Sequence, residues 1–303
     1  MTVEIIPFAA EAKLSWAGLL AAFEAGHQLP RAEIDDMFLR RGKDTILNRA
    51  AWIDGLGSLV KVATIYPDNG ALGLPSIHGA VNLFNDKTGE LDALVDFHLV
   101  TKWKTAGDSL LAASKLARKD SRDILLVGAG TVARSMVDAY SSIFPEARFQ
   151  VWNRSPAAAE AMASDRVTPV TDLKAAVKAA DIICTATMSL SPLIQGEWLR
   201  PGQHIDLIGA YRADMREADD EVLRRASIFV DSRATTIHHI GELKDPIARG
   251  VISEGDVKAD FYDIAAGVFR RQSDDEITLS KNGGGAHLDL MTASYIAQAW
   301  RGR

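Results

Sequence analysis

Hydrophobic and polar positions alternate in two different ways along this chain, and the change falls near residue 120. In the later region, segments with helical spacing at 131–142, 157–162 and 173–179 separate short apolar runs at 124–127, 149–152, 182–185, 205–208 and 228–230. Apolar runs of this length between helical segments are typical of buried parallel strands. The pattern therefore predicts a parallel sheet with helices on both faces.

The earlier region has a different pattern. Extended runs at 44–51, 58–66, 78–84 and 91–96 are separated by segments rich in glycine and proline. Together with a predicted hairpin turn at 86–89, they indicate a largely antiparallel sheet. Helical spacing follows at 101–116, and an amphipathic helix is predicted at 287–300, after three consecutive glycines. We expect this last helix to return to the first domain and to make that domain discontinuous.

The first apolar run of the later region leads directly into a glycine motif. Residues 128–133 read Gly-Ala-Gly-Thr-Val-Ala and open a helical segment. Gly128 would allow the tight turn, Gly130 would let the backbone approach a pyrophosphate, and Ala133 would let the helix pack on the strand. The motif predicts a dinucleotide site in which Ala129, Thr131 and Val132 also take part, through backbone N–H groups at the helix start. A strand-to-helix turn without a ligand is the alternative.

The end of the next strand indicates which dinucleotide is bound. An acidic residue at this position would accept the 2′-hydroxyl of NAD, but this chain has Asn153, Arg154 and Ser155. A planar cation with neutral hydrogen-bonding neighbours suits a 2′-phosphate. We therefore expect NADPH, with NADH as the second candidate; in the alternative interpretation Arg154 is a solvated loop charge.

These patterns define the fold class, which is α/β. Residues 121–285 are expected to form a Rossmann-type NAD(P)-binding domain. Residues 1–120 and 286–303 are expected to form a discontinuous α+β domain for substrate binding and dimerisation.

Composition narrows the range of partners. The 303 residues are 47% hydrophobic and 24% charged, as in ordinary globular proteins, and the net charge of −6 disfavours nucleic acid and anionic membranes. The single cysteine, Cys184, excludes an intramolecular disulfide and is expected to be a buried strand residue. We expect a cytoplasmic protein because the N-terminus lacks the pattern of a signal peptide and no stretch has the length of a membrane span. No spacing of potential ligands indicates a metal site.

Eight motifs in order along both domains resemble the ornithine cyclodeaminase and mu-crystallin family. They lie at 59–67, 73–79, 101–107, 127–133, 152–155, 182–187, 208–212 and 215–217. The resemblance implies a nicotinamide cofactor, homodimers formed through the first domain, and additional cofactor contacts at Thr185, Ala186, Thr187, Gly209 and Ala210.

The resemblance also implies catalytic and substrate-binding residues in the first domain. Lys61 matches the family's active-site lysine, and its position inside an apolar run supports this because an unpaired buried ammonium would be costly. Arg31 matches a carboxylate-binding arginine, and Lys104 stands where the family usually has a second one. Arg49 is a candidate replacement cation, and His78 is a candidate proton donor. For Arg31, Arg49 and His78, a purely structural or solvent-exposed role is the alternative, and for Lys61 the alternative is a strand-edge lysine that faces solvent.

One departure from the family pattern decides between activities. Cyclodeaminases resemble one another in having an aspartate as general base where this chain has Tyr211. Reduction of an imine needs a hydride, a carboxylate anchor and a proton, so loss of this base matters less for a reductase. We therefore predict NADPH-dependent reduction of the cyclic imino acid delta-1-pyrroline-2-carboxylate to L-proline, with delta-1-piperideine-2-carboxylate, giving L-pipecolate, as a second substrate. The alternatives are an ornithine cyclodeaminase using NAD⁺ and an NADPH-dependent binding protein like mu-crystallin.

Overall fold

The computed structural model describes residues 3–302 and divides the chain into two compact units. The first unit comprises Met1–Lys104 and Gly285–Arg303, and the second comprises Thr105–Gly284. The last helix belongs to the first unit. The first boundary lies within helix α2 (Phe97–Leu116), whereas the sequence placed it after that helix, at residue 120.

The first unit is built on a six-stranded sheet with the order β1-β6-β5-β4-β3-β2. All neighbouring strands are antiparallel except β1 and β6. Its strands are β1 (Glu4–Ile6), β2 (Glu33–Arg41), β3 (Asp44–Ile53), β4 (Gly57–Ile65), β5 (Ile77–Phe84) and β6 (Leu91–Val95), and its helices are α1 (Trp16–Gly26), α9 (Ala286–Trp300) and the start of α2. The predicted antiparallel sheet and the turn between β5 and β6 are confirmed, with Gly89 in a left-handed conformation at φ 68°.

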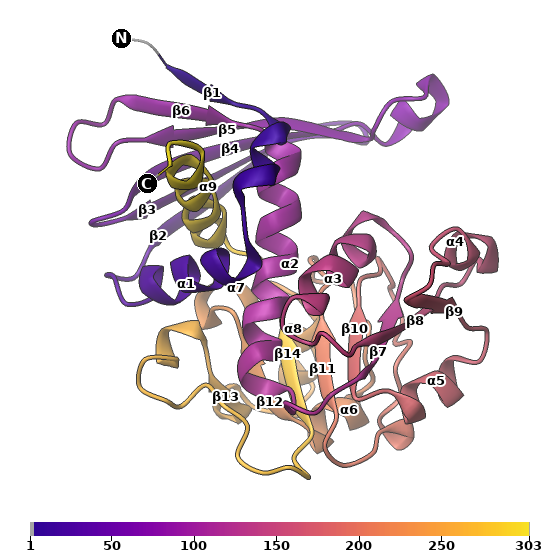
Figure 1. Ribbon diagram of the computed structural model, residues 1–303. Coiled ribbons are helices and arrows are strands. Elements are labelled where there is room, and N and C mark those ends of the chain that lie inside the picture. The colour runs from indigo at the N-terminus through magenta and orange to yellow at the C-terminus, as the bar shows by residue number, and fades with distance from the viewer. Residues whose placement is uncertain (1–2, 303) are drawn as a thin grey trace. The chain divides into compact units, whose positions relative to one another are not determined.

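Helix α9 packs across one face of this sheet and against α1 (Figure 1). Because it is covered on both sides, it is buried from Ala286 through Ser294, and again at Ile296 and Ala297. The prediction of an amphipathic helix was therefore wrong. In the part of the first unit that the structure describes, no helix covers the opposite face of the sheet (Figure 1).

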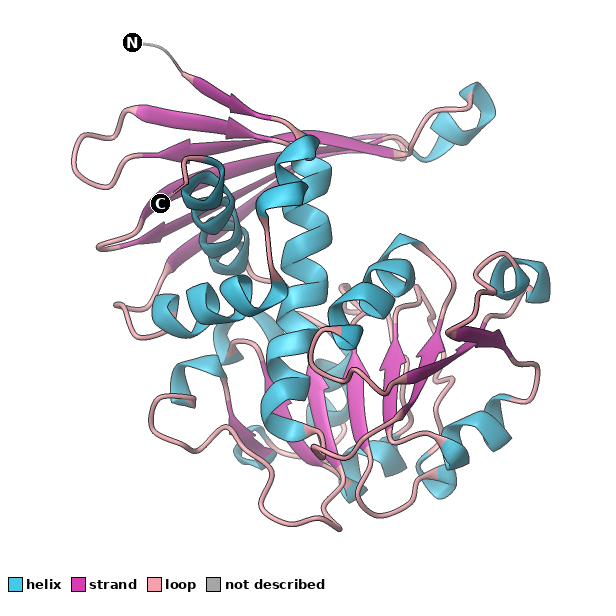
Figure 2. Ribbon diagram, in the orientation of Figure 1, coloured by secondary structure: helices cyan, strands magenta, loops and turns pink. Residues whose placement is uncertain are grey.

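The second unit has an eight-stranded, fully parallel sheet with helices on both faces, as predicted (Figure 2). The strand order is β13-β12-β14-β11-β10-β7-β8-β9. Its strands are β7 (Asp123–Val127), β8 (Arg148–Trp152), β9 (Val167–Pro169), β10 (Ile182–Thr185), β11 (His204–Leu207), β12 (Ser227–Val230), β13 (Val257–Ala259) and β14 (Thr278–Lys281). Its helices, besides the rest of α2, are α3 (Thr131–Ser141), α4 (Pro156–Glu160), α5 (Leu173–Ala179), α6 (Asp220–Arg225), α7 (Arg233–Thr236) and α8 (Gly241–Ala248).

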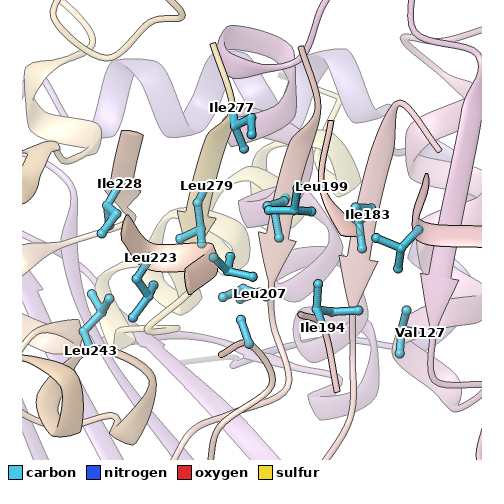
Figure 3. Close-up of a cluster of buried hydrophobic side chains, with 14 of the residues drawn as sticks. Val127, Ile183, Ile194, Leu199, Leu207, Leu223, Ile228, Leu243, Ile277 and Leu279 are labelled. Atoms are coloured by element: carbon cyan, nitrogen blue, oxygen red, sulfur yellow. The ribbon is translucent and has the colours of Figure 1, made fainter. Parts of the chain in front are cut away.

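Aliphatic side chains of the central strands form the core of the second unit. Val127, Ile183, Leu207 and Leu279 come from four adjacent strands, and Leu243 of α8 belongs to the same cluster (Figure 3). This core fixes the carboxyl ends of β7, β10 and β11 side by side, because their pairing is in register through Val127, Thr185 and Leu207. Ligands of open parallel sheets bind at this edge.

Candidate functional site

The glycine motif borders a pocket of about 430 Å³ in the second unit. The pocket is formed by the loops that follow β7, β8 and β10. Its lining residues are Gly128, Ala129, Gly130, Trp152, Asn153, Arg154, Ser155, Ala186, Thr187, Met188, Ser189 and Leu193.

Glycine is suited to positions 128 and 130 for different structural reasons. Gly128 has φ 113°, and a Cβ there would lie 2.7 Å from the carbonyl oxygen of Ala186, so only glycine fits. Gly130 precedes the first turn of α3, and a Cβ there would meet no protein atom within 4 Å. The space beside Gly130 is thus open, and the free N–H groups of the first turn of α3 suit a pyrophosphate.

Arg154 supplies a positive charge to this pocket. Its side chain is exposed, and among residues 3–302 no hydrogen-bond or ion-pair partner is found for it. The Asn153 side chain donates to the carbonyl oxygen of Ser155 at 3.0 Å and shapes the turn. An arginine without a protein partner can bind a phosphate in a bidentate manner.

Not every predicted cofactor residue lines the pocket. Thr185 is fully buried inside β10, and the N–H groups of Gly209 and Ala210 donate to the Glu217 carboxylate. Thr131 and Val132 are the first residues of α3 but do not line the pocket. Conversely, Trp152, Met188, Ser189 and Leu193 line it and were not predicted. Of these, Trp152 could have been found, because it ends the strand that leads into Asn153.

A second candidate site lies in the first unit, around the buried side chain of Lys61. Lys61 is on β4, is 6% exposed, and its Nζ donates to Oδ1 of Asp289 on α9 at 2.8 Å. Its ammonium also lies 4.9 Å from the centre of the Phe97 ring. Gly79 on β5 makes room for that ring, since a Cβ at Gly79 would collide with it. The lysine is therefore held between a carboxylate and an aromatic face.

Strand pairing brings further charges to the same face of the sheet. Asp36, Arg49 and Lys61 are direct neighbours across β2, β3 and β4, and directly paired residues point to one face. The Arg49 guanidinium binds Asp36 through Nε at 3.0 Å and Nη2 at 2.9 Å, and its Nη1 lies 3.8 Å from Oδ2 of Asp289. Arg49 is therefore held by protein carboxylates and is not a solvated arginine.

Lys104 on α2 is the third cation of this group. It is 8% exposed, and no hydrogen-bond or ion-pair partner is found for it in the described part of the chain. Its charge nevertheless acts on both Lys61 and Asp289. The group thus holds three cations, Arg49, Lys61 and Lys104, and two carboxylates, Asp36 and Asp289. Its surplus positive charge suits an anionic ligand. We call these five residues the cation cluster.

Burial and neighbouring charges shift the pKa values of Lys61 and Asp289. Burial lowers the pKa of Lys61, as do the charges of Lys104 and Arg49, while Asp289 opposes the shift. Burial raises the pKa of Asp289, but the charges of Lys61, Lys104 and Arg49 outweigh this, so that its pKa is below the usual value. Asp289 therefore remains ionised, and Lys61 can give up a proton more readily than a solvated lysine.

The structure does not bring His78 into the cation cluster. His78 is exposed and pairs with Thr64, one position out of phase with Lys61, so it lies on the opposite face of the sheet. This placement contradicts its predicted role as a proton donor beside Lys61. Arg31 is exposed in the segment before β2. Asp289 was missed by the sequence analysis, although an aspartate inside the apolar helical segment 286–297 is a signal for a buried partner.

The carboxylate that follows Tyr211 along the chain, Asp214, is in an ion pair. Tyr211 is 59% exposed, and Asp214 is engaged by Arg212 through two hydrogen bonds of 2.8 and 3.0 Å. This ion pair holds the pKa of Asp214 below its usual value. No group of three or more potential metal ligands, and no helix long and apolar enough to cross a membrane, is present within residues 3–302.

A Rossmann-type pocket and a separate sheet with a buried, paired lysine define a two-unit dinucleotide-binding protein. The model of the ornithine cyclodeaminase/mu-crystallin family matches residues 53–303, and the chain belongs to this family.

Three known proteins are similar over nearly the whole chain. The chain is 52% identical over 301 residues to a delta(1)-pyrroline-2-carboxylate reductase of Paracoccus denitrificans, covering 97% of this chain and 95% of the relative. A Thermococcus litoralis delta(1)-pyrroline-2-carboxylate reductase in complex with NADH and L-proline has TM-score 0.89 and 28% identity, with 98% and 97% covered. An archaeal alanine dehydrogenase dimer with bound NAD has TM-score 0.89 and 27% identity, with 99% and 96% covered.

Proposed function

We propose that this protein is an NADPH-dependent reductase of cyclic imino acids, which converts delta-1-pyrroline-2-carboxylate to L-proline. The observation that carries the proposal is the cation cluster, in which a buried lysine can donate a proton and a neighbouring buried lysine can bind a carboxylate. The similarity to two reductases named for this substrate supports it. Delta-1-piperideine-2-carboxylate, giving L-pipecolate, is the proposed second substrate.

The proposed substrate carries one carboxylate and one imine nitrogen, and the cluster has a group for each. Lys104 has no hydrogen-bond or ion-pair partner within residues 3–302 and is the first carboxylate anchor, with Arg49 and Arg31 as further candidates. Lys61 donates a proton to the imine nitrogen as it becomes an amine, and Asp289 holds the ammonium in place through its 2.8 Å hydrogen bond. Because Lys61 is buried and its pKa is lowered, this transfer is easier than from a solvated lysine.

The pocket of the second unit fits a nicotinamide dinucleotide. The open space beside Gly130 and the start of α3 suit a pyrophosphate. Arg154, for which the described residues provide no partner, suits a 2′-phosphate. A bound nicotinamide cofactor would supply the hydride to C2 of the imine. We propose NADPH as the preferred cofactor because an arginine and no acid follows β8, and NADH as the weaker one.

The two alternatives have less support from the observations. Ornithine cyclodeamination requires a base on the amino acid, and Tyr211 provides none while Asp214 is bound to Arg212. A binding protein with little turnover would not need a buried Lys61 with a lowered pKa, since removing an ammonium from water carries a large cost.

We also propose that the protein is a homodimer formed through the uncovered face of the first sheet. Met37, Leu39 and Trp52 are 50%, 55% and 56% exposed, and strand pairing places all three on the face opposite Lys61. An exposed apolar sheet face of this kind marks an interaction surface. The related alanine dehydrogenase is described as a dimer. A cytoplasmic location is proposed as well, and the free, buried Cys184 is compatible with a reducing compartment.

The proposal is tested by following NADPH oxidation with each imino acid and identifying the amino acid formed. We expect oxidation that depends on delta-1-pyrroline-2-carboxylate and yields L-proline, with NADH less effective at equal concentration. Absence of imine-dependent oxidation with either cofactor would refute the proposal.

A further inference from the structure

The carboxylate of Glu217 joins two loops at the carboxyl edge of the parallel sheet. Glu217 is fully buried, and its Oε1 accepts hydrogen bonds from the N–H and the hydroxyl of Thr187, both at 2.7 Å. Its Oε2 accepts from the N–H groups of Gly209 at 2.7 Å and Ala210 at 3.2 Å. A carboxylate has about four lone-pair positions, and all of them are used here.

Glu217 also holds the other end of the loop that begins at Thr187. Its carbonyl oxygen accepts from the N–H groups of Leu193 at 2.8 Å and Ile194 at 3.0 Å. Between these two attachments, Met188 and Ser189 line the dinucleotide pocket, as do Thr187 and Leu193 themselves. One residue therefore fastens both ends of the 187–193 loop, whose middle residues are largely exposed.

The loops are packed so closely that a shift in one is transmitted to the next. A Cβ on Gly209 would collide with the backbone of Thr187, and a Cβ on Gly128 would lie 2.7 Å from the Ala186 carbonyl oxygen. The backbones after β7, β10 and β11 thus touch without intervening side chains. Fixing Thr187 and Gly209 also fixes the wall against which the Gly128 turn packs.

Buried neighbours fix the backbone of Glu217 and place a cation near it. The N–H groups of Glu217 and Ala218 donate to the carboxylate of Glu242 at 2.7 and 3.0 Å. Lys281 is fully buried nearby, with its Nζ donating to the carbonyl oxygens of Leu207 and Asn282, both at 2.9 Å. Burial lowers the pKa of Lys281, and the charges of Glu217 and Glu242 oppose this shift. The buried carboxylates therefore have a counter-charge.

We propose that Glu217 is a positioning residue that holds the 187–193 loop in the conformation that binds the nicotinamide dinucleotide. It acts through Thr187, Gly209 and Leu193. The inference rests on the proposed function, since it assumes that the pocket is the cofactor site.

The test is the substitution Glu217→Gln, which keeps the size of the side chain. The glutamine NH₂ group must face either the N–H of Thr187 or those of Gly209 and Ala210, which places donor against donor. We expect the Kd of NADPH, measured by fluorescence without substrate, to rise tenfold or more. The KM for NADPH should rise in parallel, and kcat at saturating NADPH should stay within about threefold.

Glu242→Gln is the matched control. Glu242 is equally buried and binds the backbone of the same segment, but it has no contact with Thr187 or Gly209 among its hydrogen bonds. We expect its Tm to fall as far as that of E217Q while its Kd for NADPH stays within threefold of the wild-type value. An unchanged Kd in E217Q, or equal increases in both variants, would overturn the inference.

Two further outcomes are distinguishable. If E217Q does not fold, Thr187→Val removes only the hydroxyl donor to Oε1 and should raise the Kd severalfold; an unchanged Kd would overturn the inference. Failure of the wild-type protein to bind NADPH or NADH would refute the proposed function and the inference together. Wild-type binding with an unaltered E217Q refutes the positioning role alone.

Discussion

The dinucleotide pocket and the cation cluster differ in what builds them. The pocket is formed mostly by backbone and small residues at the ends of adjacent parallel strands, with one exposed arginine. The cation cluster consists of buried and half-buried charged side chains from β2, β3, β4, α2 and α9, and its central ion pair joins residues 228 positions apart. Substitutions in the cluster should therefore cost more than substitutions at the pocket rim, because buried charges lose their partners in a medium that water cannot enter.

The largest effect is expected at Lys61. Lys61→Met keeps most of the buried stem and removes the ammonium. We expect kcat/KM for the imino acid to fall about 10²–10⁴-fold, the usual contribution of a positioned proton donor, while the Kd of NADPH stays the same. Steady-state kinetics and cofactor fluorescence measure the two quantities. Wild-type kcat/KM in this variant would show that Lys61 is only structural.

A smaller effect is expected at Lys104. Lys104→Met should raise the KM for the imino acid about 10- to 100-fold, because a charge-assisted hydrogen bond contributes about 1.5–3 kcal/mol. Lys104→Arg keeps the charge and adds a bidentate fork, so its KM should be close to the wild-type value or lower. Equal KM values for all three proteins would remove Lys104 from the carboxylate site.

The exposed Arg154 should matter less, and only for one cofactor. Arg154→Ala should raise the KM for NADPH about tenfold, which corresponds to the lower end of the range for a charged hydrogen bond because solvent screens the side chain. The KM for NADH should hardly change, since NADH has no 2′-phosphate. Equal losses for both cofactors would contradict the assignment of Arg154.

Asp289→Asn should change the pH dependence of activity, and the change should appear on the alkaline side of the pH profile. Asp289 raises the pKa of Lys61 against the effect of burial, so its neutralisation should lower that pKa further. Activity that needs protonated Lys61 is lost as pH rises through this pKa. The alkaline limb of kcat/KM should therefore move to lower pH in the variant. An alkaline limb that stays in place or moves to higher pH would show that Asp289 does not raise the pKa of Lys61. A thermal melt of the variant checks that it is folded.

The difference between the dinucleotide pocket and the cation cluster also explains which parts of the site could be predicted from the sequence. The strands and turn around Gly128, and the pocket residues Asn153, Arg154 and Ser155, follow from local spacing, because a strand, a turn and a helix start are neighbours in sequence. The pairing of Lys61 with Asp289 could not be found this way, since it depends on α9 packing across the first sheet.

Strand β2 and the position of His78 are two further features that could not be predicted from the sequence. In β2, charged residues such as Asp35 and Asp36 interrupt the apolar alternation, so no strand was predicted there. His78 matched a family motif, but a motif does not show which face of the sheet a residue occupies. Register decides this, because a shift of one residue moves a side chain to the other face.

The most direct test of the reductase assignment follows the transferred hydrogen. The protein is incubated with delta-1-pyrroline-2-carboxylate and NADPH carrying deuterium at both C4 positions, and the product is analysed by mass spectrometry. A parallel incubation with ornithine and NAD⁺ is assayed for ammonia. We predict L-proline with one deuterium at C2, and negligible ammonia from ornithine. Robust ammonia release without deuterated proline would contradict the account and make the protein a cyclodeaminase.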